Sequence, residues 1–240
     1  MQVSAPYFKI ETFGAVDGPG VRLVVFLQGC PLRCIYCHNP ESWSLKSNLS
    51  ITPNEVIEIY MKNHGFYRNG GITLSGGEPL IHEKFCLELA KLCNEQNISL
   101  ALDTSGATFS KSHVIFYRKL IKYRPLWIVD IKHINPKKHK LITGVSIQNE
   151  LSLIKFLERN KQHYWIRQVL VPKYTDDPKD LKLLHKFISN LKFMDRFEIL
   201  PYHRLGINKY KQLGLENSVI NVKEPSKLDV AKAKQLILVK

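Results

Sequence analysis

Strand-length apolar runs alternate with helical segments along most of this chain, and the alternation limits its fold more than any other feature. Runs of strand length lie at 21–28, 72–75, 99–103, 127–131, 164–171 and 196–200. Segments with a helical apolar period lie at 52–67, 83–96, 110–121, 147–160, 178–190 and 226–237. Several strands are apolar almost throughout, which is typical of a parallel sheet covered by helices. We therefore expect one α/β domain over residues 1–240, either an incomplete TIM-like (β/α)6 barrel or a strongly curved parallel sheet.

Polar or glycine-rich groups stand where the predicted strands end. In chain order they are Cys30, Cys34 and Cys37, then Gly76, Gly77 and Glu78, then Asp103 and Thr104, then Asp130 and Lys132, with Arg167 inside the fifth strand and His203 after the sixth. The carboxyl ends of parallel strands meet at one edge of a sheet or barrel. We therefore expect these groups to share one site.

Gly76, Gly77 and Glu78 each allow a functional and a structural interpretation. The glycines could let the backbone approach a ligand, or they could form a plain turn. Glu78 could accept a ligand ammonium group or cap the next segment.

The charged residues of the apolar strands need partners, because an unpaired buried charge is costly. Asp103 and Asp130 require a cation, a network of donors or each other, and Lys132 or a metal ion could serve. Arg167 must meet a carboxylate or a carbonyl group, and Asp17 is a candidate. His203 could be structural, although its place after the last strand favours a ligand.

Three cysteines with C-x3-C-x2-C spacing, Cys30, Cys34 and Cys37, can hold an iron-sulfur cube while one iron keeps no protein ligand. A zinc site would need a fourth ligand, and His38 is awkwardly placed next to Cys37 for that role. A disulfide framework is unnecessary in a chain of 240 residues. The remaining pair, Cys86 and Cys93, is seven residues apart on a predicted helix and is expected to be buried and apolar.

The formal net charge of +14 does not by itself indicate nucleic-acid binding. The basic residues are scattered, and neither a recognition motif nor an aromatic stacking platform accompanies them. They favour a solvated surface that could steer an acidic protein partner. The sequence has no secretory leader and no run of 18 uncharged apolar residues, so we expect a cytoplasmic protein without a membrane segment.

The cysteine run resembles the signature of the radical S-adenosylmethionine superfamily. The segments D-G-P-G-V-R (17–22) and F-L-Q-G-C (26–30) narrow the resemblance to glycyl-radical-enzyme activases. Further matches cover nearly the whole chain: Y-C-H-N (36–39), S-G-G-E (75–78), L-D-T-S-G (102–106), D-I-K (130–132), W-I-R (165–167) and L-P-Y-H (200–203). The resemblance implies the radical SAM fold.

The resemblance also implies a reaction. A [4Fe-4S] cluster on Cys30, Cys34 and Cys37 would bind S-adenosylmethionine and cleave it reductively, and the resulting 5'-deoxyadenosyl radical would take a hydrogen atom from a backbone glycine of a partner. The implied catalytic residues are the three cysteines, Lys132 and His203. The implied cofactor contacts are Tyr36, His38, Asn39, Gly76, Gly77, Glu78, Asp130, Ile131, Lys132 and His203.

Other roles follow from the same resemblance. Asp103, Thr104, Ile128 and Asp130 would hold a monovalent cation, Na⁺ or K⁺. Asp17 and Arg167 would receive the partner's peptide. The partners would be a glycyl radical enzyme, pyruvate formate-lyase, and reduced flavodoxin or ferredoxin as electron donor. We expect a monomer with a role in anaerobic glucose metabolism.

Overall fold

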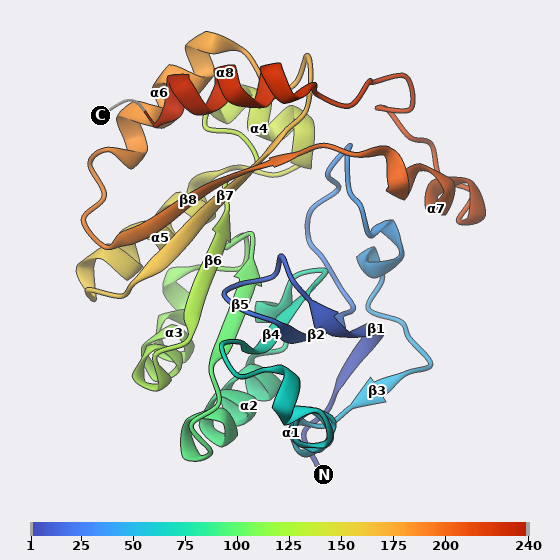
Figure 1. Cartoon of the computed structure of the whole chain (residues 1–240), viewed down its shortest axis with the longest axis vertical. Coiled ribbons are helices and arrows are strands. Elements are labelled where there is room, and N and C mark those ends of the chain that lie inside the picture. The colour runs from blue at the N-terminus through green and yellow to red at the C-terminus, as the bar shows by residue number, and fades with distance from the viewer. Residues whose placement is uncertain (1, 239–240) are drawn as a thin grey trace. The chain divides into compact units, whose positions relative to one another are not determined.

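The computed structural model describes residues 2–238, and they form two compact units (Figure 1). Within the described residues, the first unit comprises 2–31 and Glu41–Ile128, and the second comprises Leu32–Pro40 and 129–238. The boundary falls inside β6 (Leu126–Asp130). Each unit alternates strands with helices, which confirms the α/β class.

The first unit contains a five-stranded part of the sheet with the order β3-β1-β2-β4-β5. Its strands are β1 (Ala5–Gly14), β2 (Arg22–Leu27), β3 (Ser50–Ile51), β4 (Gly71–Gly76) and β5 (Leu100–Thr104). The three strands expected here, β2, β4 and β5, are parallel and mostly buried. The sequence analysis did not predict β1 and β3, which pair antiparallel. Most of β1 is only half-buried, so its sequence has no continuous apolar run.

The helices of the first unit are α1 (Pro53–Lys62), α2 (Glu83–Glu95) and α3 (Val114–Leu120). A capping box between Thr52 and Glu55 starts α1. Short 3-10 turns continue or precede these helices: η2 (His64–Phe66), η3 (Pro79–Ile81), η4 (Lys111–His113) and η5 (Ile121–Tyr123). Cys86 and Cys93 lie on α2 and are buried, as expected.

In the second unit β7 (Tyr164–Leu170) and β8 (Met194–Pro201) are parallel. Its helices are α4 (Pro136–Thr143), α5 (Gln148–Arg159), α6 (Pro178–Ile188), α7 (Ile207–Gln212) and α8 (Lys227–Ile237). The last of these packs beside α6 (Figure 1). The sequence analysis missed α4 and α7, which are short and rich in lysine and so have only a weak apolar period.

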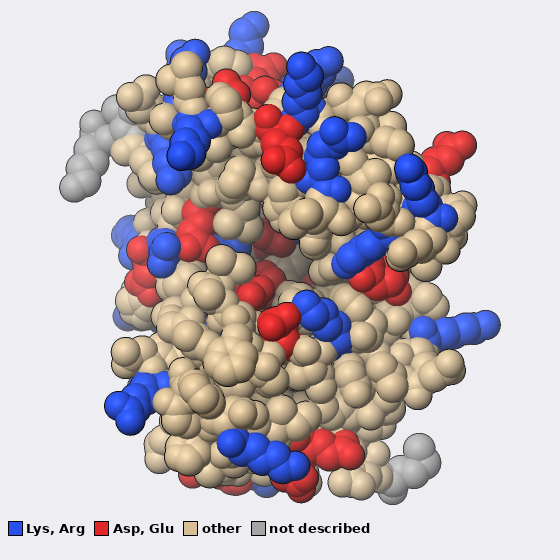
Figure 2. All heavy atoms as spheres, turned by 45° about the vertical axis from the view of Figure 1, so that its right-hand side comes forward, with Lys and Arg blue, Asp and Glu red and all other residues tan. Residues whose placement is uncertain are grey.

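Basic side chains are spread over the face drawn in Figure 2, with acidic side chains between them. No helix within residues 2–238 combines the length and the apolar character needed to cross a membrane.

A buried pair of titratable side chains joins α4 to α5. The Nε2 atom of His139 lies 3.0 and 2.9 Å from the two carboxylate oxygens of Glu150, and neither residue is exposed. The Nδ1 atom of His139 lies 3.0 Å from the carbonyl oxygen of Val145, so Nδ1 donates a proton there. While Glu150 is protonated, its proton therefore lies between Nε2 and the carboxyl group. Burial is the main cause that raises the pKa of Glu150 to about 7.

Replacing Glu150 by Gln should remove a pH dependence from folding stability. The pKa of Glu150 in the folded state, about 7, lies above its ordinary value of 4.5. Glu150 therefore contributes fully to folding stability below pH 4.5, and this contribution is lost as the pH rises through about 7. Relative to Glu150→Gln, the free energy of unfolding of the wild type should fall by roughly 3 kcal/mol across this range. Urea unfolding of both proteins at several pH values measures the difference. A difference that stays constant with pH would show that Glu150 does not titrate in this range.

Candidate functional site

The loop after β2 carries the three cysteines. Cys34 is buried, while Cys30 and Cys37 are partly exposed, and none of them forms a disulfide. The backbone on either side of Cys34 is tied to the end of α4: Arg33 donates its N–H to the carbonyl of Thr143 at 2.8 Å, and Ile35 donates to Ile142 at 3.0 Å. The N–H of Cys37 bonds to the carbonyl of Cys34 at 3.0 Å and closes a tight turn. The conformation from Cys34 to Cys37 is therefore fixed by main-chain bonds.

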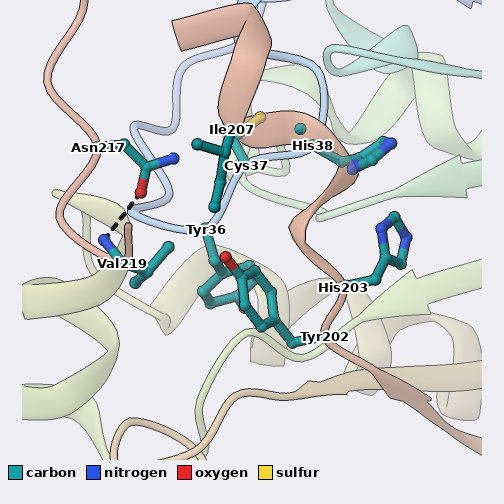
Figure 3. A pocket seen from close by; sticks show the side chains of 9 residues that line it. Tyr36, Cys37, His38, Tyr202, His203, Ile207, Asn217 and Val219 are labelled. Atoms are coloured by element: carbon teal, nitrogen blue, oxygen red, sulfur yellow. Dashed lines mark hydrogen bonds between the residues drawn. The ribbon is translucent and has the colours of Figure 1, made fainter. Parts of the chain in front are cut away.

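A pocket opens beside the third cysteine (Figure 3). Its lining residues, all in the second unit, are Tyr36, Cys37, His38, Tyr202, His203, Gly206, Ile207, Asn217 and Val219. The rings of His38 and His203 meet edge to face, and their centroids lie 4.4 Å apart. The empty volume is about 180 Å³, including open solvent.

The hydroxyl of Tyr36 is the strongest sign that the pocket takes a ligand. The residue is 8% exposed, and its hydroxyl is buried without a hydrogen-bond partner among the described residues. Burial raises the pKa of Tyr36 well above its ordinary value, although Lys132 opposes the shift. A buried hydroxyl without a partner is costly and rare in folded proteins. A polar ligand atom would remove that cost.

Asp130 and Lys132 satisfy each other at the end of β6. The Nζ atom of Lys132 lies 2.5 Å from a carboxylate oxygen of Asp130, which confirms that this lysine can supply the cation that Asp130 needs. Burial alone would lower the pKa of Lys132, but Asp130, Cys34 and Tyr36 together raise it well above its ordinary value. The ammonium group therefore stays charged. Between the two residues, Ile131 is fully buried and donates its N–H to the carbonyl of Arg167 at 2.8 Å.

Arg167 meets a carboxylate, as its burial in an apolar strand requires. Its Nε atom donates to Glu198 at 2.7 Å, and Glu198 is its register partner on β8. Asp17, the other expected peptide-binding residue, lies in the first unit, where its carbonyl accepts a hydrogen bond from Thr73 Oγ1 at 2.7 Å.

Gly76 and Gly77 allow a close approach between main chains of the first unit. A Cβ atom on Gly76 would lie 2.4 Å from the backbone nitrogen of Leu27, and one on Gly77 would lie 2.1 Å from the carbonyl oxygen of Gly29. Gly76 also has a φ of +109°. This packing accounts for both glycines without a ligand and favours the structural interpretation.

Glu78 is fully buried, and both of its carboxylate oxygens are used. Thr104 Oγ1 donates to it at 2.6 Å, Ser105 donates through both its N–H (2.9 Å) and its hydroxyl (2.6 Å), and the N–H of Leu80 donates at 3.2 Å. Burial raises the pKa of Glu78, and these hydrogen bonds oppose the rise. Of the two interpretations, the structure favours the cap, which here also joins the end of β4 to the end of β5.

The expected cation ligands are also engaged by protein groups. Asp103 accepts a hydrogen bond from Ser75 Oγ at 2.8 Å, and Thr104 accepts one from the N–H of Gly106 at 2.9 Å. Ile128 is fully buried in β6, and Asn39 accepts a hydrogen bond from Lys209 at 3.0 Å.

Sequence reasoning missed part of the pocket wall. Four of the missed residues, Gly206, Ile207, Asn217 and Val219, come from η6 (Arg204–Gly206), α7 and the loop beyond it. Nothing in their sequence marks them, whereas Tyr202 stands directly before His203 and could have been included. The structure does bring Tyr36, Cys37, His38 and His203 to one pocket, in agreement with the expected shared site for these residues.

Glu78→Gln should destabilise the fold, because an amide NH₂ would face groups that donate to the carboxylate. We expect a loss of about 1–3 kcal/mol in the free energy of unfolding, measured by urea titration. Glu95→Gln on the exposed end of α2 is the matched control and should change little. An unchanged stability in Glu78→Gln would contradict the structural role.

Comparisons with known proteins place the chain in a family. The family described as "4Fe-4S single cluster domain" matches residues 16–161. A pyruvate formate-lyase-activating enzyme of Streptococcus mutans is 41% identical over 232 residues, which cover 95% of this chain and 88% of the relative.

Two solved structures are similar in fold. SuiB of Streptococcus suis, bound to its precursor peptide SuiA, has a TM-score of 0.68 at 16% identity, covering 95% of this chain and 46% of that one. A radical SAM methyltransferase of Sphaerobacter thermophilus has a TM-score of 0.65 at 14% identity, and the match covers 90% of this chain and 63% of that one. Together they show the radical SAM fold, which confirms the expected partial barrel. The relative from Streptococcus mutans, 41% identical over 95% of this chain, shows that this chain belongs to the family of pyruvate formate-lyase-activating enzymes.

Proposed function

We propose that this protein activates pyruvate formate-lyase by generating a glycyl radical on it. The observation that carries the proposal is the pocket beside Cys37, where the Tyr36 hydroxyl lacks a partner among residues 2–238, in a chain 41% identical to an activating enzyme. A [4Fe-4S] cluster on Cys30, Cys34 and Cys37 would supply one electron to S-adenosylmethionine, giving methionine and a 5'-deoxyadenosyl radical that takes a hydrogen atom from a backbone glycine.

The protein's own residues bind and orient the cofactor. Tyr36, His38 and His203 would contact one part of it in the pocket that they line. Lys132, held charged by Asp130, would attract a carboxylate at the same edge. Ile131 is expected to contact the cofactor beside them.

Five residues of the first unit, and Asn39 of the second, have supporting roles in this proposal. Asn39, in the second unit, and Gly76 and Gly77 would contribute main-chain or side-chain contacts to the cofactor. Glu78 would act mainly by holding the ends of β4 and β5 in place, as its hydrogen bonds support. Asp103 and Thr104 would help to hold the cation.

A monovalent cation, Na⁺ or K⁺, would bind among Asp103, Thr104, Ile128 and Asp130. Carboxylate and carbonyl oxygens are the ligands that hard cations prefer. Asp17 and Arg167 would shape the place where the partner's glycine loop enters. Because the radical attacks indiscriminately, the loop must exclude water and lie in position before the carbon–sulfur bond breaks.

The compartment and the electron donor of the protein are part of the proposal. The protein would act as one domain and as a monomer in the cytoplasm, where thiolates stay reduced, in anaerobic glucose metabolism. Reduced flavodoxin or ferredoxin would deliver the electron, and a formal charge of +14 favours encounter with such an acidic carrier.

Cys34→Ala should abolish cluster assembly and activation together, because Cys34 is one of only three ligands. The reconstituted enzyme, reductant and S-adenosylmethionine are mixed anaerobically with pyruvate formate-lyase, and the glycyl radical is measured by electron paramagnetic resonance. Cys93→Ala, which removes a buried thiol from α2, is the control and should retain iron and activity. A wild-type protein that assembles a cluster but radicalises only a different glycyl radical enzyme would contradict the assigned partner. A wild type without iron would refute the function itself.

Tyr36→Phe should weaken cofactor binding without destabilising the cofactor-free protein. The hydroxyl has no described partner to lose, whereas a bond to the cofactor is worth about 0.5–1.5 kcal/mol, or roughly a 2- to 12-fold change in the dissociation constant. Calorimetric titration with S-adenosylmethionine measures this dissociation constant. Tyr67→Phe is a matched control, because the Tyr67 hydroxyl is also buried and without a partner in the described residues but lies outside the pocket. Equal affinity in Tyr36→Phe and Tyr67→Phe would show that Tyr36 makes no such bond.

A further inference from the structure

Helix α7 and the residue directly before it, Gly206, contact three successive residues that begin at the third cysteine. Tyr210 donates its hydroxyl proton to the carbonyl oxygen of Cys37 at 3.1 Å. Lys209 donates to the side chain of Asn39 at 3.0 Å. Between them, Gly206 lies against His38, where an added Cβ atom would come within 3.1 Å of the Nδ1 atom. Figure 3 shows this region from the pocket side, with Cys37 and His38 next to Ile207 at the start of α7.

The Tyr210 hydroxyl is suited to act as a donor. The residue is 2% exposed, so its hydrogen bond is shielded from solvent. A carbonyl oxygen can only accept, so the phenol is the donor of the hydrogen bond to Cys37. The acceptor is the peptide group that joins Cys37 to His38.

That one peptide group connects two parts of the site. On one side it continues into Cys37, a proposed cluster ligand, and on the other into His38, whose ring meets His203 in the pocket wall. Rotation of the peptide would therefore move the thiolate and the imidazole together. Groups that orient metal ligands without touching the metal typically change metal affinity or activity by about 10- to 100-fold when they are removed.

We propose that Tyr210 is a positioning residue for the iron-sulfur centre: through the Cys37–His38 peptide it sets the orientation of the third thiolate and of the adjoining pocket wall. The proposal rests on the proposed function, because it requires a cluster on Cys37. It also explains the place of α7. A helix of six residues has little stability of its own, so tertiary contacts such as this one decide where it lies.

The test compares Tyr210→Phe with Tyr164→Phe, both as anaerobically reconstituted holoenzyme. Tyr164 is also fully buried in the second unit, and its hydroxyl donates to Glu158 at 2.7 Å, away from the pocket residues. Each substitution removes one buried phenol hydrogen bond and keeps the ring. A general loss of stability should therefore affect both variants alike.

Three readouts separate positioning from a structural role: the electron paramagnetic resonance spectrum of the reduced cluster, the rate of iron loss to EDTA, and the affinity for S-adenosylmethionine. We expect Tyr210→Phe to assemble the cluster, to show shifted g-values, to lose iron about tenfold faster than wild type and to bind the cofactor more weakly. Tyr164→Phe should match wild type in all three.

Two outcomes would overturn the inference, and they are distinguishable. If Tyr210→Phe matches Tyr164→Phe in g-values and iron loss while wild type carries a cluster, Tyr210 is only a core residue and the proposed function stands. If wild type itself assembles no cluster, the proposed function fails and takes this inference with it.

Discussion

The site depends on two main-chain hydrogen bonds from the cysteine loop to the end of α4. The last carbonyl groups of a helix have no partners within it, and here Ile142 and Thr143 accept the N–H groups of Ile35 and Arg33. Cys34 stands between these two donors, so its backbone is fixed like that of a strand residue. The buried pair of His139 and Glu150 holds α4 to α5, and thus a contact between two helices that carry no cysteine supports the loop.

Buried polar groups differ in how far the protein itself satisfies them. Glu78 has all its acceptor positions near Thr104, Ser105 and Leu80 filled, and Asp130 is matched by Lys132. The Tyr36 hydroxyl, by contrast, is buried and has no partner among the described residues. A fully satisfied group stabilises the fold, whereas an unsatisfied one that also lines a pocket, as Tyr36 does, is a candidate ligand contact. This difference separates Tyr36 from Glu78 and Asp130, which the sequence alone treats alike.

Much of this could be predicted from local pattern. All six expected strands correspond to β2, β4, β5, β6, β7 and β8. Strands buried on both faces, such as β2, β4 and β5, leave a continuous apolar signal. The half-exposed β1 and the lysine-rich α4 and α7 leave no such signal and were missed. Glu78 could be recognised as a candidate site residue, but the sequence did not decide between its two roles, because its partners Thr104 and Ser105 lie at the end of the next strand.

The sequence by itself determined the chemistry that this chain can perform. Thiolate spacing, the strand–helix alternation and the polar groups at strand ends are local properties that packing does not change. Only the tertiary structure decided which polar groups form hydrogen bonds within the fold and which can still bind a ligand. The fate of a polar atom depends on neighbours distant along the chain, as when Tyr210 reaches back to the carbonyl of Cys37, and no local pattern carries that information.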